Sequence, residues 1–188
     1  MSFELRHHIE SIVKLTDDEF DLILSHFKRI HFVKNQIVVH ENNKVVYDYF
    51  IIQGLMKASS IDYEGNEHII YFAIEGCWIT DSQAYHQQLP ATYLIDTVEP
   101  TKALAISLEN LEKLCRDLPK MEYFFRKKTT MEQVMLQRRI LCLISHSAKE
   151  RYESLLVQYP TLIQRVPKVL IASYLGVSRE TLSRLSHV

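Results

Sequence analysis

Residues 167–185 read PKVLIASYLGVSRETLSRL, and this stretch predicts two short helices joined by a tight turn. Ile171 and Leu175 recur at helical spacing, so both can face one core. Gly176 stands where the chain must turn sharply, because glycine adopts the left-handed backbone conformation at little cost. Ser178 follows as the cap of the second helix. The stretch therefore predicts a helix-turn-helix.

The side chains left facing outward on this motif suit the major groove of DNA. Arginine can form two hydrogen bonds with guanine, and glutamate can accept one from cytosine. Serine and threonine hydroxyls and lysine suit the phosphates. The candidate DNA-contacting residues are Lys168, Ser178, Arg179, Glu180, Thr181, Ser183 and Arg184. A helical hairpin that does not bind DNA is the alternative interpretation of the same glycine turn.

The charge of the chain is unevenly distributed. Residues 138–188 hold eight Lys and Arg against three Asp and Glu, a balance of +5. The formal net charge of the whole chain is −1, so residues 1–137 carry −6. An acidic front and a basic back indicate that the back faces a polyanion, although an ordinary solvated surface is the alternative.

The composition is that of a globular protein, with 47% hydrophobic residues and only 4 Gly and 5 Pro. Cys77, Cys115 and Cys142 are far apart, which argues against a metal cluster or a disulfide framework and favours reduced thiols. No signal-like or membrane-spanning apolar run is present. We expect a cytoplasmic protein without a cofactor or a membrane contact.

Between residues 31 and 108 the pattern changes to short segments rich in Val, Ile, Tyr and Phe, separated by polar turns. The predicted strands are 37–40, 47–53, 55–62, 68–74, 93–98 and 102–107. Many short strands at close spacing predict a β-barrel or jelly roll. Residues 3–29 are predicted to be helical, with a capping box formed by Thr16 and Glu19.

A long segment, residues 120–146, contains neither Gly nor Pro and predicts one continuous helix. Its apolar side chains form two faces, so the helix needs two partners to bury them. One face can pack on the β-domain of the same chain, and the other can pack on the same helix of a second copy. A single core that covers both faces is the alternative. Shorter helices are predicted at 108–117 and 148–158.

The run from Ile171 to Arg184 closely resembles the helix-turn-helix of the Crp/Fnr regulators, and the strands and long helix precede it in that family's order. The resemblance implies an α+β fold: an N-terminal double-stranded β-helix (jelly roll) with flanking helices, a long dimerisation helix, and a small, mostly helical helix-turn-helix domain. The domains implied are 1–118, cyclic-nucleotide-binding-like; 119–146, dimerisation helix; and 147–188, DNA-binding. The resemblance makes Arg179, Glu180 and Arg184 the base-reading residues.

The cyclic-nucleotide-binding members of that family carry a Gly-Glu pair for the ribose and an Arg for the phosphate. Here Thr80 and Asp81 stand in place of the pair, and Ala91 stands in place of the Arg. A phosphate without its guanidinium is poorly paired, so we do not expect a cyclic nucleotide to bind. Another effector, or none, is left open. The candidate pocket residues are Gly76, Trp78, Asp81, Tyr85 and Thr92, although Trp78 and Tyr85 can equally fill the space themselves.

Two further sensor types lack their ligands. No Cys precedes Cys77, whereas iron–sulfur oxygen sensing needs a cysteine cluster near the N-terminus. Haem needs an axial ligand, and no spacing marks one among the available histidines, which are His31, His40, His68 and His86. Only three residues follow Leu185, so we expect the β-hairpin wing to be absent or reduced.

The sequence thus predicts a non-enzymatic, dimeric, sequence-specific transcription regulator. Its expected partners are double-stranded DNA with a palindromic operator, a second copy of the chain and, as an optional contact, RNA polymerase. One alternative is an effector-binding or scaffold module whose helix-turn-helix is vestigial. The other is a cupin-like metalloenzyme, which is disfavoured because His68 lacks the second histidine that such a site needs.

Overall fold

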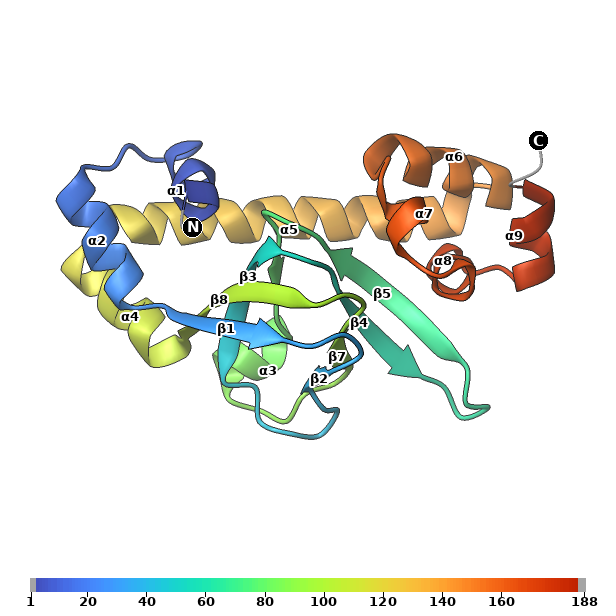
Figure 1. Ribbon diagram of the computed structural model, residues 1–188, viewed down its shortest axis with the longest axis horizontal. Helices are drawn as coiled ribbons and strands as arrows, with labels where there is room; N and C mark the ends of the chain where they lie inside the picture. Colours follow the sequence, from blue (N-terminus) through green and yellow to red (C-terminus); the bar gives the residue numbers. More distant parts are fainter. Residues whose placement is uncertain (1–2, 186–188) are drawn as a thin grey trace. The chain divides into compact units, whose positions relative to one another are not determined.

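The computed structural model describes residues 3–185, so residues 186–188 of the predicted DNA-binding domain lie outside it (Figure 1). The chain forms two compact units. Unit 1 comprises residues 1–59 and 72–129, and unit 2 comprises residues 60–71 and 130–188.

The main segments follow one another in the order that the sequence predicts, with N-terminal helical residues first, then the strands, and then the C-terminal helices. The helices are α1 (Phe3–Glu10), α2 (Asp17–Ser25), α3 (Ser82–Gln87), α4 (Leu108–Asp117), α5 (Lys120–Ser145), α6 (Ala148–Gln158), α7 (Leu162–Arg165), α8 (Lys168–Leu175) and α9 (Arg179–Leu185). The strands are β1 (Lys28–Phe32), β2 (Ile37–Val39), β3 (Tyr47–Gln53), β4 (Met56–Ile61), β5 (Glu67–Ala73), β6 (Trp78–Ile79), β7 (Leu94–Thr97) and β8 (Thr101–Ser107).

The strands form two four-stranded sheets, in the orders β1-β8-β3-β6 and β2-β7-β4-β5. Strands distant in sequence pair antiparallel, as β1 does with β8 and β4 does with β7. This arrangement is that of a jelly roll. The predicted α+β fold, with its β-roll, flanking helices, long helix and small helical C-terminal part, is confirmed.

Helices cover the outer face of the first sheet in unit 1. Leu5 and Ile9 of α1 pack into one core with Phe50 of β3, Leu104 of β8 and Phe124 of α5. All five side chains are at most 1% exposed. The apolar residues recur at helical spacing on the helices and at every second position on the strands, so both present an apolar face to this layer. This packing positions the first half of α5 on the sheet.

A buried ion pair fixes this first half of α5. The Nζ atom of Lys128 lies 2.6 Å from Oδ2 of Asp48 on β3, and both side chains are less than a tenth exposed. The ammonium group also lies 4.6 Å from the centre of the Trp78 ring. A charge without its partner at such a site costs about 3–5 kcal/mol, so this pair specifies one seating of the helix.

The predicted helix over residues 3–29 is wrong in its continuity. The chain instead forms α1, a break at residues 11–16, α2 and then β1. The capping box at Thr16 is present, and it begins a second helix rather than lying inside one. β1 was missed because its partner β8 follows about 70 residues later, and this pairing overrides the local pattern. β6 and α3 are also additions to the predicted elements.

Candidate nucleic-acid interface and effector pocket

The turn between α8 and α9 has the geometry that its glycine predicts. Gly176 adopts φ 64° and ψ 41°, which is the left-handed region. Its N–H donates to the carbonyl of Ser173, and the N–H of Val177 donates to the carbonyl of Ala172, at 3.1 and 3.0 Å. These bonds satisfy the last carbonyls of α8 and end the helix. The next helix then starts within three residues.

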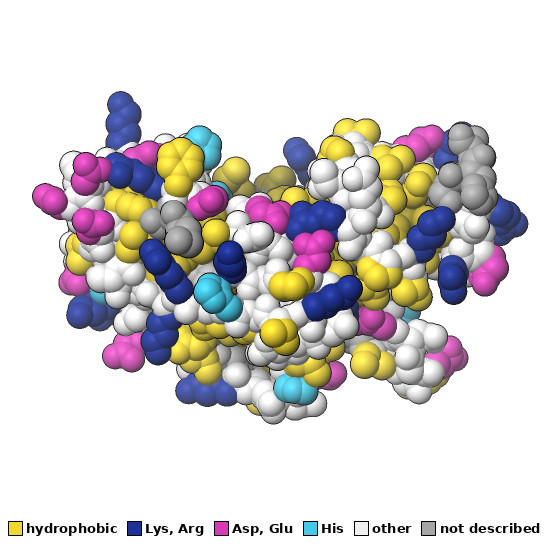
Figure 2. All heavy atoms as spheres, viewed as in Figure 1, with side chains coloured by type: hydrophobic (Ala, Val, Ile, Leu, Met, Phe, Trp, Pro, Cys, Tyr) yellow, Lys and Arg dark blue, Asp and Glu magenta, His cyan; other side chains and the backbone are white. Residues whose placement is uncertain are grey.

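The second helix, α9, buries one side and exposes the other. Leu182 is 2% exposed and holds α9 to the rest of unit 2. Arg179, Glu180 and Arg184 are exposed on the helix, and Ser178 is exposed immediately before it. Lys168 is exposed at the start of α8, whereas Thr181 and Ser183 are half-buried. Figure 2 shows Lys and Arg side chains over the C-terminal helices of this face.

Hydrogen bonds order the outward row of α9. The Ser178 hydroxyl accepts the N–H of Thr181 at 3.2 Å and caps the helix as predicted. Arg184 donates from Nη2 to the hydroxyl of Thr181, also at 3.2 Å. Hydrogen bonds from its own backbone and from Ser178 lower the pKa of Glu180, which favours its carboxylate form. The row thus presents two guanidinium groups and one carboxylate to solvent.

Two arginines from other helices hold the C-terminal end of α8, and the sequence reasoning missed both roles. Arg139 of α5 donates from Nη2 to the carbonyl of Tyr174, and its guanidinium lies 3.7 Å from the centre of that tyrosine ring. Arg151 of α6 donates from Nε to the carbonyl of Leu175 at 2.9 Å. Cations beside the last carbonyls of a helix are favourable. They set where the turn and α9 begin.

A serine of α8 bonds the β4–β5 hairpin within unit 2. The hydroxyl of Ser173 donates to the carbonyl of Glu67, and it accepts the N–H of Ile69 at 3.1 Å. β5 is the last strand of its sheet, so one of its edges has no neighbouring strand. Ser173 occupies part of that edge, where it supplies one donor and one acceptor to the strand.

The candidate effector residues do not form one constellation. Asp81 and Thr92 lie together: Oδ2 of Asp81 accepts both the N–H and the hydroxyl of Thr92, each at 2.7 Å. Its other oxygen accepts the N–H of Ala84 at 3.1 Å and caps α3. Asp81 is 1% exposed and Ala91 is 2% exposed. Both oxygens of the carboxylate are therefore engaged within the protein.

The two aromatic candidates fill the core. Tyr85 is fully buried, its hydroxyl donates to the carbonyl of Ile106, and burial raises its pKa far above the usual range. Trp78 belongs to the layer between the sheet and the helices, where its Nε1–H donates to Nε2 of His8 at 3.1 Å. Gly76 lies in the turn before β6 with φ 80°. Of these three residues, Tyr85 contacts the pair of Asp81 and Thr92 through its backbone, because its N–H donates to the carbonyl of Asp81 at 2.8 Å.

Comparison with known proteins agrees with this architecture. Residues 29–118 match the cyclic nucleotide-binding domain family. A search of curated proteins finds no match. The chain is similar in structure to FixK2 from Bradyrhizobium japonicum, with a TM-score of 0.76 and 18% identity over 86% of this chain and 83% of that one.

Two further solved structures share the fold. A putative transcriptional regulator of the Crp/Fnr family from Eubacterium rectale gives a TM-score of 0.68 at 18% identity, over 92% of this chain and 82% of that one. The catabolite activator protein of Thermus thermophilus gives 0.58 at 20% identity, over 94% and 84%. The chain thus contains a cyclic-nucleotide-binding-type β-roll and has the fold of Crp/Fnr regulators.

Two classes of feature are missing from the part of the chain that the structure describes. None of its helices is long and apolar enough to cross a membrane. Its His, Cys, Asp and Glu side chains form no group of three or more that could hold a metal ion.

The contact between Arg139 and Tyr174 gives a prediction for stability. We expect Arg139→Met to lower the free energy of unfolding by about 1–3 kcal/mol, because a half-buried charged hydrogen bond and a ring contact are lost. Chemical denaturation monitored by circular dichroism measures the change. Arg138→Met is the matched control. Arg138 is the neighbouring residue and its side chain is exposed, so this substitution should change the free energy of unfolding little. Equal losses in both variants would contradict the role assigned to Arg139.

Proposed function

We propose that this chain is a DNA-binding transcription regulator of the Crp/Fnr type that acts as a homodimer in the cytoplasm. In this proposal residues 1–118 form a β-roll domain, residues 119–146 the dimerisation helix, and residues 147–188 the DNA-binding domain. Its partner is duplex DNA with a palindromic operator, and RNA polymerase is an optional further contact. No catalytic role is proposed.

One observation carries the DNA-binding proposal. Arg179, Glu180 and Arg184 lie exposed on a short helix that follows a left-handed glycine, while Leu182 anchors the opposite side of that helix. A helix presented in this way can enter the major groove, where guanidinium groups read guanine and a carboxylate reads cytosine. Lys168 and the hydroxyls of Ser178, Thr181 and Ser183 are assigned to phosphates and register.

The DNA contacts can be tested by separating base readers from phosphate binders. On a site selected from random duplexes, Arg179→Ala should weaken binding by about 1–3 kcal/mol and relax the preference at one base pair. Lys168→Gln should weaken binding to all sequences alike and reduce the salt slope by about 1. Fluorescence anisotropy over a series of salt concentrations measures both effects.

Lys113→Ala serves as the control, because it removes an exposed positive charge on α4, outside the proposed interface. Full-length protein that shows no sequence preference, together with unchanged binding by Arg179→Ala, would overturn the proposal. That pair of results would favour the alternative of an effector-binding or scaffold module.

The exposed half of α5 supports the homodimer. From Met131 onward the helix presents eight large apolar side chains that are 40–78% exposed. They are Met131, Val134, Met135, Leu136, Ile140, Leu141, Leu143 and Ile144. A helix of this kind is unusual on a monomer surface, and the same surface on a second copy would bury it. A dimer would present two recognition helices to two half-sites about 34 Å apart.

Ile140→Glu tests this face, because Leu136 and Leu143 lie one turn away on either side. We expect the variant to weaken self-association at least about a hundredfold, since unpaired carboxylates would lie in apolar surface. Sedimentation equilibrium measures the association constant. Val157→Glu on α6 is the control, as Val157 is 83% exposed outside α5. A monomeric wild-type protein at micromolar concentration would contradict the proposed dimer.

The buried carboxylate of Asp81 supports the absence of cyclic-nucleotide binding. Thr92 follows Ala91, the position where related domains place the phosphate-binding Arg, and the amide and hydroxyl of Thr92 already bind Asp81. A cyclic nucleotide would bring a phosphate beside this carboxylate without a guanidinium to offset the repulsion. In this proposal Asp81 serves as an internal acceptor where relatives have their ligand.

Asp81→Ala should lower the free energy of unfolding by about 1–3 kcal/mol, because the polar groups of Thr92 and Ala84 lose their acceptor. Asp21→Ala, an exposed position on α2, should have little effect. Thermal unfolding of the wild type should not change when cyclic AMP is added. A saturable rise of its melting temperature with cyclic AMP would refute this part of the proposal.

A further inference from the structure

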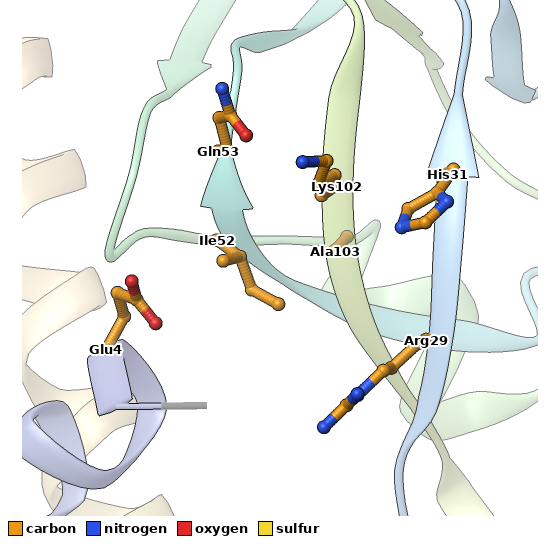
Figure 3. A pocket seen from close by; sticks show the side chains of 7 residues that line it. All are labelled: Glu4, Arg29, His31, Ile52, Gln53, Lys102 and Ala103. Atoms are coloured by element: carbon orange, nitrogen blue, oxygen red, sulfur yellow. The ribbon is translucent and has the colours of Figure 1, made fainter. Parts of the chain in front are cut away.

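A pocket of about 260 Å³ lies on the first sheet of unit 1, away from Asp81 and Thr92. Its lining comes from α1, β1, β3 and β8, as Figure 3 shows. The lining residues are Glu4, Arg29, His31, Ile52, Gln53, Lys102 and Ala103. His31 and Lys102 extend from facing positions on β1 and β8, and Arg29 lies two residues further along β1, with its guanidinium directed away from Lys102 (Figure 3).

The polar side chains of this pocket have no partner among residues 3–185. No hydrogen bond or ion pair engages the side chains of Glu4, Arg29, His31, Gln53 or Lys102. The buried lysines of unit 1 are paired, Lys57 with Asp96 and Lys128 with Asp48. The polar side chains of the pocket are instead exposed to solvent, where they are open to a ligand.

The sheet register places the basic side chains of the pocket on one face of the sheet. His31 of β1 lies directly opposite Lys102 of β8, and Arg29 points to the same face because it is two residues from His31. Basic side chains directly opposite one another do not stabilise a sheet, and they repel when both are charged. An anion between them would remove the repulsion and use the free donors.

We propose that this pocket binds a small phosphorylated compound of sugar-phosphate size. Arg29 and Lys102 hold the phosphate, and His31 adds a third donor. Gln53 and Glu4, at the other side of the pocket, accept hydroxyl groups of the ligand. Ile52 and Ala103 form the apolar floor. The volume of about 260 Å³ is below the usual range for drug-sized ligands and suits a small metabolite.

The site is independent of the DNA-binding proposal and of the cyclic-nucleotide cradle. It requires neither α9 nor a second copy of the chain. Its chemistry also differs from that of the position around Ala91. There Ala91 stands in place of the Arg and a buried carboxylate binds Thr92, whereas here Arg29 and Lys102 are exposed to solvent and Glu4 is the one acidic residue of the lining.

Glucose 6-phosphate is a suitable probe, and isothermal titration calorimetry with the full chain is the measurement. We expect saturable binding to the wild type and no binding of neutral glucose. Arg29→Gln/Lys102→Gln should weaken the affinity by about tenfold or more, because two charge-assisted contacts are lost. Lys113→Gln/Arg116→Gln removes the same charge from exposed positions on α4 and should bind like the wild type.

Amide chemical shifts should locate the ligand, with changes concentrated at Gln53 and Ala103. If the double variant does not fold, Lys102→Gln alone carries the comparison, since its side chain is exposed. Equal loss of affinity in both double variants would show non-specific charge attraction and overturn the site. Absence of saturable binding to the wild type would overturn it as well.

Discussion

The buried ion pair between Lys128 and Asp48 is the contact on which the placement of α5 depends. Met121, Phe124 and Phe125 pack this half of the helix into the core of unit 1. The ammonium group of Lys128, which is less than a tenth exposed, must in addition reach one carboxylate on β3. The pair need not add net stability, since both charges lose their hydration. Its contribution is to fix one position of α5 on the sheet.

The consequence concerns the rest of α5. Its first half is covered by unit 1, whereas its second half offers eight exposed apolar side chains. The same second half carries Arg139, which reaches the last carbonyls of α8. One helix thus combines a core segment, the surface proposed to bind a second copy, and a contact at the end of the first helix of the proposed DNA-binding motif. A mutation in α5 can therefore affect association and the start of α9 through different side chains.

Local signals made the C-terminal motif predictable from the sequence. Gly176 and Ser178 act on the backbone within four residues, so their pattern already specifies the turn and the cap. The strands were predicted to within one or two residues, because alternation is also a local signal. β1 was not predicted, because only its pairing with β8 makes it a strand. The contact between Arg139 and Tyr174 was not predicted for the same reason, since no residue near Arg139 in the chain indicates that it reaches Tyr174.

Contacts between residues that are not neighbours in the chain also decide the structure of the candidate effector region. The sequence shows Ala91 at the position expected for the phosphate-binding Arg. It does not show which group accepts the hydrogen bonds of the neighbouring Thr92. The structure assigns them to Asp81, eleven residues from Thr92, whose amide and hydroxyl both bind the carboxylate at 2.7 Å. An acid held inside the fold accepts both donors of Thr92, which supports the proposal that this part of the β-roll binds no cyclic nucleotide. Free cationic groups instead face solvent around Arg29 and Lys102, and in unit 1 an anion would find unused donors there rather than beside Thr92.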